Sequence, residues 1–213
     1  MSPVREEKKK QTRQRLMEAA WQLVTRQGLE KTTVQQIAAL ANAGTGTFYN
    51  YFPSKEMALA VYLDEATGRV LDGIVLSELP DSPEEAVSLM FNVIFKAADV
   101  PLDRALLRDL MAASFKAGSV NAGEDQSATA KLVQADERII TMVSLILQRK
   151  ESQVYLKPGR DPFLAAMAIY SHFTMGWMGY LVEYLPTLDA VLNMVREMNH
   201  LIFSGLLQEK HHE

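Results

Sequence analysis

The 213-residue chain contains no cysteine. This absence excludes disulfide bonds, zinc sites built from thiolates and redox sensing by cysteine. The N-terminus is polar and charged and lacks the apolar segment of a signal peptide, so we expect a cytoplasmic protein. The remaining composition, with 48% hydrophobic and 23% charged residues, is that of an ordinary globular protein.

Sequence patterns of catalysis are also absent. The chain has no glycine pattern of a nucleotide-binding loop and no nucleophile elbow. Glu197 and His200 have the spacing of one di-iron ligand pair, but such a site needs a second pair, and His172 has Ile169 three residues before it. We therefore expect no enzyme activity, no bound metal and no cofactor.

Residues 162–182 contain no charged side chain, and this run is long enough to raise the possibility of a transmembrane helix. Ser171, His172 and Thr174 within the run argue against that interpretation, as do the acidic residues that flank it. A helix that is apolar all round is also typical of a buried position in a helical bundle. We expect no membrane span.

Charge is distributed unevenly along the chain. Residues 1–56 carry nine Lys/Arg and five Asp/Glu, whereas the remainder carries thirteen and twenty-one. Lys9, Lys10 and Arg13 lie near the start of a helix expected over residues 10–27, where the helix dipole gains nothing from cations. Contacts with phosphate explain these residues better than helix stability does. We expect residues 1–9 to form a flexible arm. The alternative to phosphate contact is that this arm is merely solvated and frayed.

Residues 32–52, TTVQQIAALANAGTGTFYNYF, contain two short helical patterns separated by a tight break. Thr33 and Gln36 fit a capping box at the start of the first pattern. Phe48 and Phe52 lie one helical turn apart in the second pattern and can be buried together. The segment therefore predicts a helix-turn-helix. The second helix turns these small or hydrogen-bonding residues outward: Gly46, Thr47, Tyr49 and Asn50.

The segment GTFYNYFPSKE, preceded by TTVQQIA, resembles the DNA-binding domain of the TetR family of bacterial transcription regulators. The resemblance covers residues 10–65 approximately. Gly44 stands where the family usually has a Ser cap, and Asn42 stands where a turn Gly is usual. Because Gly can cap a helix and Asn tolerates left-handed backbone, we expect the same fold with a slightly weaker cap.

The helical patterns predict an all-α protein of about nine helices. We expect a three-helix, helix-turn-helix DNA-binding domain with a basic N-terminal arm over residues 1–54. A larger helical domain for effector binding and dimerisation would follow over residues 55–213. Ser54, Ser82, Asp161 and Thr187 are predicted to cap the starts of helices in this second part.

The resemblance implies binding to double-stranded DNA. We expect the second helix of the helix-turn-helix to contact bases or phosphates, with backbone contacts from the residues around it. The residues expected to contact DNA are Lys9, Lys10, Arg13, Thr33, Thr45, Gly46, Thr47, Tyr49, Asn50, Tyr51 and Lys55.

The last expected helix carries an apolar stripe at helical spacing. Its members are Leu188, Val191, Val195, Met198, Ile202 and Leu206. In the family that this chain resembles, the last two helices pair with their copies across a two-fold axis, which implies a homodimer reading a pseudo-palindrome. Gly176 and Gly179 would allow a close helix approach that suits a subunit interface. The alternative is a stripe that packs within one chain.

The resemblance also implies a small-molecule effector in the C-terminal domain. The absence of charge over residues 162–182 favours a mostly apolar effector, whereas Arg104 or Arg108 could serve an anionic one. The candidate lining residues are Phe91, Phe95, Met111, Phe115, Met142, Tyr170, His172, Phe173 and Trp177. The alternative for most of these positions is an ordinary hydrophobic core.

We interpret the chain as a regulator of transcription, most simply a repressor that a small effector releases from DNA. Two alternatives keep the same fold: an activator, and an interaction protein that responds to a protein partner. A helical-bundle enzyme is a third alternative, and it would need a bound metal or cofactor.

Overall fold

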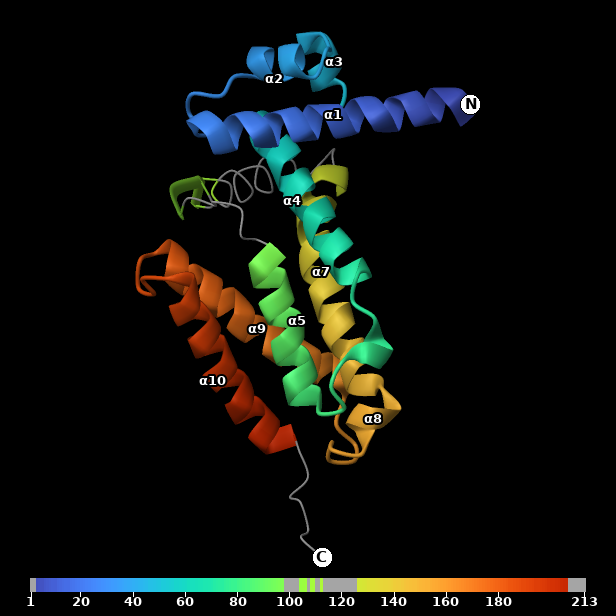
Figure 1. The fold of residues 1–213 in the computed structure, drawn as a ribbon, viewed down its shortest axis with the longest axis vertical. Coiled ribbons are helices and arrows are strands. Elements are labelled where there is room, and N and C mark those ends of the chain that lie inside the picture. The colour runs from blue at the N-terminus through green and yellow to red at the C-terminus, as the bar shows by residue number, and fades with distance from the viewer. Residues whose placement is uncertain (1–2, 98–103, 107, 110–111, 113–125, 207–213) are drawn as a thin grey trace, which may run out of the picture. The chain divides into compact units, whose positions relative to one another are not determined.

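The structure is a computed structural model that describes residues 3–97, 104–106, 108–109, 112 and 126–206. These residues form helices and connecting loops without a strand, which confirms the predicted all-α fold (Figure 1). The chain divides into two compact units. One comprises Met1–Ala66 and Pro101–Gln134, and the other comprises Thr67–Val100 and Ala135–Glu213. The domain boundary expected after residue 54 stays a prediction.

The first unit contains the helices at the N-terminal end. They are α1 (Pro3–Gln27), α2 (Val34–Leu40), α3 (Thr45–Tyr49) and the first part of α4 (Lys55–Asp72). Its buried core includes Leu16, Met17, Ala20, Val24, Ile37, Ala38, Phe48, Phe52, Ala58 and Leu59. Trp21 of α1 stacks on Tyr62 of α4 with 4.9 Å between ring centroids. The helix-turn-helix is thus seated on a platform made by α1 and α4.

Helix α1 begins at Pro3, so a flexible arm over residues 1–9 is wrong for the described part of that segment. Proline is favoured at the first position of a helix, where its missing N–H has no partner to lose. Glu6 lies in the first turn, near the positive end of the helix dipole. Gln11 donates a hydrogen bond of 3.1 Å to the carboxylate of Glu7. These local interactions extend the helix toward the N-terminus.

The second unit contains the remaining helices. They are the last part of α4, the short 3-10 helix η1 (Leu76–Glu78), α5 (Pro83–Ala97), the last part of α7 (Gln126–Gln148), α8 (Lys150–Gln153), α9 (Pro162–Leu181) and α10 (Leu188–Leu206). Its core includes Val87, Met90, Phe91, Ile139, Val143, Ile146, Leu147, Ile169, Phe173, Val191, Val195 and Phe203. None of the helices in the described part of the chain has the length and hydrophobicity that a bilayer crossing requires.

The predicted capping residues hold the starts of four helices. The hydroxyl of Ser54 accepts a hydrogen bond from the backbone N–H of Met57 at 3.1 Å. The carboxylate of Asp161 accepts from Phe163 at 2.8 Å. Ser82 and Thr187 make equivalent contacts at 3.5 and 3.1 Å. Each contact satisfies a backbone donor that the helix itself leaves unpaired, which confirms the predicted starts.

Arg149 fixes the connection between α4 and α5. Its guanidinium donates hydrogen bonds to the backbone carbonyls of Leu76 at 2.8 Å, Leu79 at 3.3 Å and Pro80 at 2.6 Å. A guanidinium has five N–H donors and can therefore satisfy several carbonyls at once. Arg149 itself leaves helical geometry, with φ −60° and ψ 148°, at the junction between α7 and α8.

At Gly176, α9 packs closely against α10. A Cβ atom at this position would lie 2.9 Å from Cγ2 of Val195 and 3.0 Å from Cγ1 of Val191. At Gly179, a Cβ atom would lie 3.0 Å from Cδ1 of Leu185. These contacts all lie within one chain, so the expectation that the two glycines serve a subunit interface is corrected. Part of the stripe on α10 packs in the same way, since Val191 and Val195 are buried.

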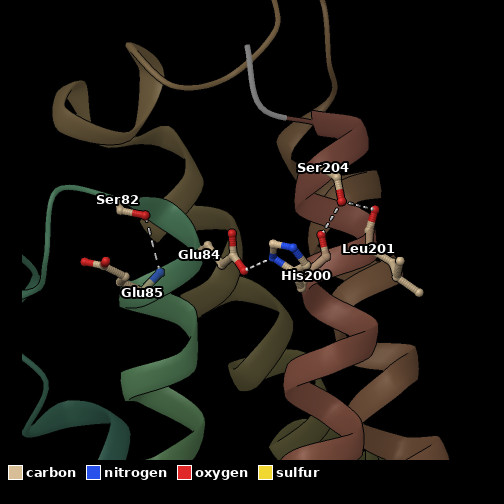
Figure 2. Close-up of polar contacts among 6 residues, drawn as sticks. All are labelled: Ser82, Glu84, Glu85, His200, Leu201 and Ser204. Carbon is tan, nitrogen blue, oxygen red and sulfur yellow. Dashed lines mark hydrogen bonds and ion pairs between the residues drawn. The ribbon is translucent and has the colours of Figure 1, made fainter. Parts of the chain in front are cut away.

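His200 of α10 contacts α5 through a carboxylate. Its Nδ1 lies 2.8 Å from Oε1 of Glu84 (Figure 2). The hydrogen bond and the charge of Glu84 raise the pKa of His200 above its usual value, and the charge of Glu197 adds a smaller effect in the same direction. Within the described residues, no group of His, Asp and Glu is arranged to hold a metal ion.

The substitution Gly176→Leu is expected to lower the free energy of unfolding by roughly 1–3 kcal/mol, because overpacking pushes α9 away from α10. Urea denaturation followed by circular dichroism measures this change. Gly205→Ala is the control, since a Cβ atom there meets nothing within 4 Å. Equal stability of Gly176→Leu and the wild type would contradict the close contact.

The pKa of His200, measured by NMR titration, is expected to exceed the ordinary value of about 6.5. Because folding raises this pKa, the His200–Glu84 contact stabilises the fold at pH values below the unfolded pKa. That contribution is lost as the pH rises through the folded pKa. Glu84→Gln should return the pKa to its ordinary range, whereas Glu197→Gln should lower it only slightly. Equal effects of the two substitutions would contradict this assignment.

Candidate nucleic-acid interface

Helix α2 begins with the predicted capping box. The hydroxyl of Thr33 accepts a hydrogen bond from the N–H of Gln36 at 3.2 Å, and Oε1 of Gln36 accepts from the N–H of Thr33 at 2.9 Å. Nε2 of Gln27 donates to the same Oε1 at 3.1 Å. The box therefore fixes both the start of α2 and its attachment to the end of α1.

The turn between α2 and α3 has the geometry expected from its unusual residues. Asn42 adopts a left-handed backbone with φ 51°. Gly44 caps α3 in an extended conformation without a side-chain hydrogen bond, while its carbonyl accepts from the N–H of Phe48 at 3.1 Å. The two departures from the family pattern thus preserve the turn, as predicted.

Helix α3 is held from beneath by two phenylalanines. Phe48 is fully buried, Phe52 is 2% exposed, and their ring centroids lie 5.7 Å apart. A helix of five residues is too short to be stable alone in water, so this packing is what maintains it. The same packing decides which side of α3 faces outward.

The outward side of α3 is polar and uncharged. Gly46, Tyr49 and Asn50 are exposed, and Thr45 and Thr47 are half-buried. Tyr49 is 54% exposed, and its ring packs edge-on against Phe48. The predicted contact residues Thr45 to Asn50 therefore share one accessible surface. Tyr51 is half-buried beside Phe52, with 6.4 Å between the ring centroids.

Lys55 is engaged inside its own unit. Its Nζ donates hydrogen bonds to the backbone carbonyls of Leu29 at 2.6 Å and Thr32 at 2.8 Å. The ammonium therefore joins the start of α4 to the loop between α1 and α2. Sequence reasoning missed this role because its partners lie more than twenty residues earlier in the chain. The phosphate contact expected of Lys55 stays a prediction.

The three predicted basic residues of α1 differ in their surroundings. Lys9 and Lys10 are exposed. The guanidinium of Arg13 forms an ion pair with Glu65 of α4 and lies 5.7 Å from the centroid of the Phe52 ring. Lys9 and Lys10 thus present charge to solvent, whereas Arg13 also holds α1 against α4.

The second group of predicted residues comprises the effector candidates, and those that the structure describes lie in the other unit. Phe91 of α5 stacks on Phe173 of α9 with 5.0 Å between ring centroids. Tyr170 and Trp177 contact Phe173 from the same helix at 5.9 and 6.2 Å. Phe91 and Phe173 are buried core residues, which is the alternative stated for these positions. Met142 packs against this core. Met111, Phe115 and the side chain of Phe95 lie outside the described residues.

Two polar groups of α9 have distinctive environments. The hydroxyl of Tyr170 donates a hydrogen bond to Asp136 of α7. Partial burial raises the pKa of both groups, and the hydrogen bond raises that of Tyr170 further while it opposes the rise at Asp136. The buried Nδ1 of His172 has no hydrogen-bond partner among the described residues. Asp136 was missed from sequence because nothing in a linear pattern pairs it with Tyr170.

The second unit has a groove that none of the predicted effector residues lines. Its volume is about 440 Å³. It is lined by Arg69, Val70, Gly73, Ile74, Val75, Glu78, Leu79, Leu89, Met90 and Val93. In the sequence these residues show only helical spacing. The groove therefore could not be predicted from the sequence.

A short helix seated on a capped helix, with an accessible polar surface, defines the chain as a helix-turn-helix protein. Residues 16–60 match the family model described as "Bacterial regulatory proteins, tetR family". The match shows that this N-terminal segment is similar to the helix-turn-helix domain of TetR-family regulators. The matched residues include α2, α3 and the contacts that hold them.

Two curated relatives agree with this assignment. The chain is 26% identical over 188 residues to the uncharacterized HTH-type transcriptional regulator YuxN of Bacillus subtilis, covering 86% of this chain and 61% of the relative. It is 30% identical over 91 residues to TcmR of Streptomyces glaucescens, covering 43% of this chain and 40% of the relative. The chain thus spans less than two thirds of either relative. Both are named as transcriptional regulators rather than enzymes.

Solved structures show the same fold. FadR of Thermus thermophilus, a TetR-family repressor crystallised with lauroyl-CoA, superposes with a TM-score of 0.61 at 20% identity, covering 94% of this chain and 98% of that one. A putative TetR-family regulator from Mesorhizobium loti has a TM-score of 0.66 at 15% identity, with the same coverage. The similarity to these structures extends the family fold beyond the DNA-binding domain.

The substitution Lys55→Met is expected to destabilise the first unit by roughly 1–3 kcal/mol, since two carbonyls lose a charged donor. In a Trp177→Phe background, fluorescence of Trp21 reports the unfolding of this unit in urea, because the chain has two tryptophans. Lys31→Met removes an exposed ammonium and should leave stability unchanged. A Lys55→Met variant as stable as the background would refute the structural role.

Proposed function

We propose that this chain is a homodimeric transcriptional repressor. It binds a pseudo-palindromic operator through α3 and dissociates when a small, mostly apolar effector binds its C-terminal helices. The observation that carries the proposal is the accessible, uncharged surface of α3, anchored by Phe48 and Phe52. Exposed Lys9 and Lys10 supply sequence-independent attraction to phosphates. Base contacts then fix the register on the duplex.

The outer face of α9 supports a dimer. Leu164, Met175 and Val182 are 62%, 60% and 65% exposed, and Met167 and Met178 on the same face are also exposed. These residues follow helical spacing along a helix that contains no charged side chain. Exposed apolar faces of this kind mark association sites. A second copy of α9 and α10 would cover the face and place two recognition helices on one two-fold axis.

The second unit supports an effector site. Its rings at Tyr170, Phe173 and Trp177 offer apolar contact area. The hydroxyl of Tyr170 and Nδ1 of His172, which has no hydrogen-bond partner among the described residues, would serve as polar anchors. Apolar walls with a few placed polar groups are typical of small-molecule sites. The lauroyl-CoA complex of FadR supports a ligand with an extended apolar part.

Release of DNA would be transmitted by α4. This helix is continuous from Lys55 to Asp72, with residues 55–66 in the first unit and residues 67–72 in the second. An effector that prefers one position of the end of α4 shifts the population toward the matching position of the DNA-binding domain. The two DNA-binding domains of a dimer bind one operator only when they are correctly separated. A small change in this separation therefore weakens the contact of each domain with DNA.

Thr47→Ala and Tyr49→Ala are each expected to weaken operator binding by roughly 1–3 kcal/mol, because each removes a contact of α3 with DNA. The measurement is fluorescence anisotropy of labelled duplex taken from upstream of the protein's own coding region, with scrambled duplex beside it. Gln22→Ala, which removes an exposed amide from α1, is the control. Unchanged affinity in both variants would exclude α3 as the recognition helix, and failure to bind any duplex would favour an interaction protein.

Met175→Glu is expected to convert a dimer into a monomer, because it places a charge in the centre of the exposed face of α9. Sedimentation equilibrium measures the mass. Val154→Glu is the matched control, since Val154 is 70% exposed and lies outside that face. A Met175→Glu variant that remains dimeric would place the subunit interface elsewhere.

A further inference from the structure

The segment that contains α2, the turn and α3 differs from the rest of the chain in its charge. Residues 32–54 contain no charged side chain, although they include all of α2, the turn and α3. The nearest charges along the chain are Lys31 and Lys55, and the ammonium of Lys55 is bonded to two backbone carbonyls. Any base that α3 reads is therefore read by neutral groups.

Some neutral groups of this segment are already committed. The hydroxyl of Thr33 and Oε1 of Gln36 close the capping box, and Nε2 of Gln27 occupies the same Oε1. Within the described part of the chain, the side chains of Thr45, Thr47, Tyr49 and Asn50 make no hydrogen bond to other residues. The outward side of α3 thus offers one amide, two hydroxyl-methyl side chains and one phenol.

Base pairs differ in the side chains that recognise them in the major groove. Guanine presents two acceptors, N7 and O6, and is read most often by Arg or Lys. Adenine pairs with the amide of Asn or Gln, and the thymine methyl is contacted by apolar groups such as the methyl of Thr. The surface of α3 has the groups that suit adenine and thymine and lacks both cations that suit guanine.

We propose that α3 selects A·T base pairs, with Asn50 reading adenine and Thr45 and Thr47 contacting thymine methyl groups. This inference rests on the proposed binding of DNA through α3. The charges that attract the duplex lie on Lys9 and Lys10, outside the outward side of α3. Affinity and sequence preference are therefore supplied by different residues.

Gly46 supports a close approach of DNA to this surface. It lies inside α3 without positive φ, and a Cβ atom there would meet nothing within 4 Å. Neither the backbone nor the packing of the chain requires glycine at this position. A glycine inside a helix also lowers stability relative to alanine. The missing side chain therefore serves a partner outside the chain, and it opens α3 to the base edges between Thr45 and Thr47.

The test begins with selection of bound duplexes from a library of randomised DNA by the full chain. The expected result is half-sites with A·T pairs at the positions that α3 protects. Half-sites dominated by G·C pairs at those positions would overturn the inference while leaving DNA binding intact. Failure to enrich any duplex would overturn the proposed function and this inference with it.

Base analogues in the selected duplex sharpen the test. Replacing thymine by uracil removes one methyl group and should weaken binding by about fourfold at each contacted position. Replacing guanine by 7-deazaguanine should leave the affinity unchanged. The opposite pattern would show that α3 reads guanine.

Two variants assign the roles of residues. Asn50→Ala should weaken binding of the selected duplex roughly tenfold and abolish the preference at one adenine, with unchanged affinity for scrambled duplex. Gln22→Ala should change neither. Gly46→Ala should raise Tm by a few degrees and weaken binding of the selected duplex, so that loss of folding cannot explain the loss of affinity. Wild-type affinity of both Asn50→Ala and Gly46→Ala would refute the assignment.

Discussion

The burial of Phe48 and Phe52 is the contact on which the candidate interface depends. Helix α3 has five residues and cannot maintain itself by backbone hydrogen bonds alone. Its orientation is set by two rings that are buried in the core of the first unit. The orientation of the outer side of α3 follows from this packing, because the inner side is buried in the core.

Charge in the first unit has two separate uses. Arg13 and Lys55 join α1, α4 and the loop before α2 through Glu65 and backbone carbonyls. Lys9 and Lys10 remain exposed. A count of basic residues in the sequence treats all four alike, although within the part of the chain that the structure describes only Arg13 and Lys55 make such contacts. The first unit can therefore be basic while the outward side of α3 carries no charge.

The second unit combines close helix packing with a few long-range polar contacts. Gly176 lets α9 approach Val191 and Val195 of α10. Arg149 holds the carbonyls that precede α5, and His200 meets Glu84 at the start of α5. These contacts surround an aromatic core and leave the outer face of α9 uncovered. An uncovered apolar face beside a rigid core is the arrangement that a dimer interface requires.

The sequence by itself determined the all-α fold, the caps of several helices and the helix-turn-helix, because capping boxes and apolar periodicity are local properties within a few residues. Thr33 with Gln36, Ser54, and Phe48 with Phe52 could all be assigned in this way. The partners of Lys55, Arg13, Tyr170 and Gly176 were decided only by the tertiary structure. These contacts join residues far apart in the chain, and one sequence contains no signal for which distant atoms meet. The same reason explains why a glycine expected at a subunit interface packs instead within its own chain.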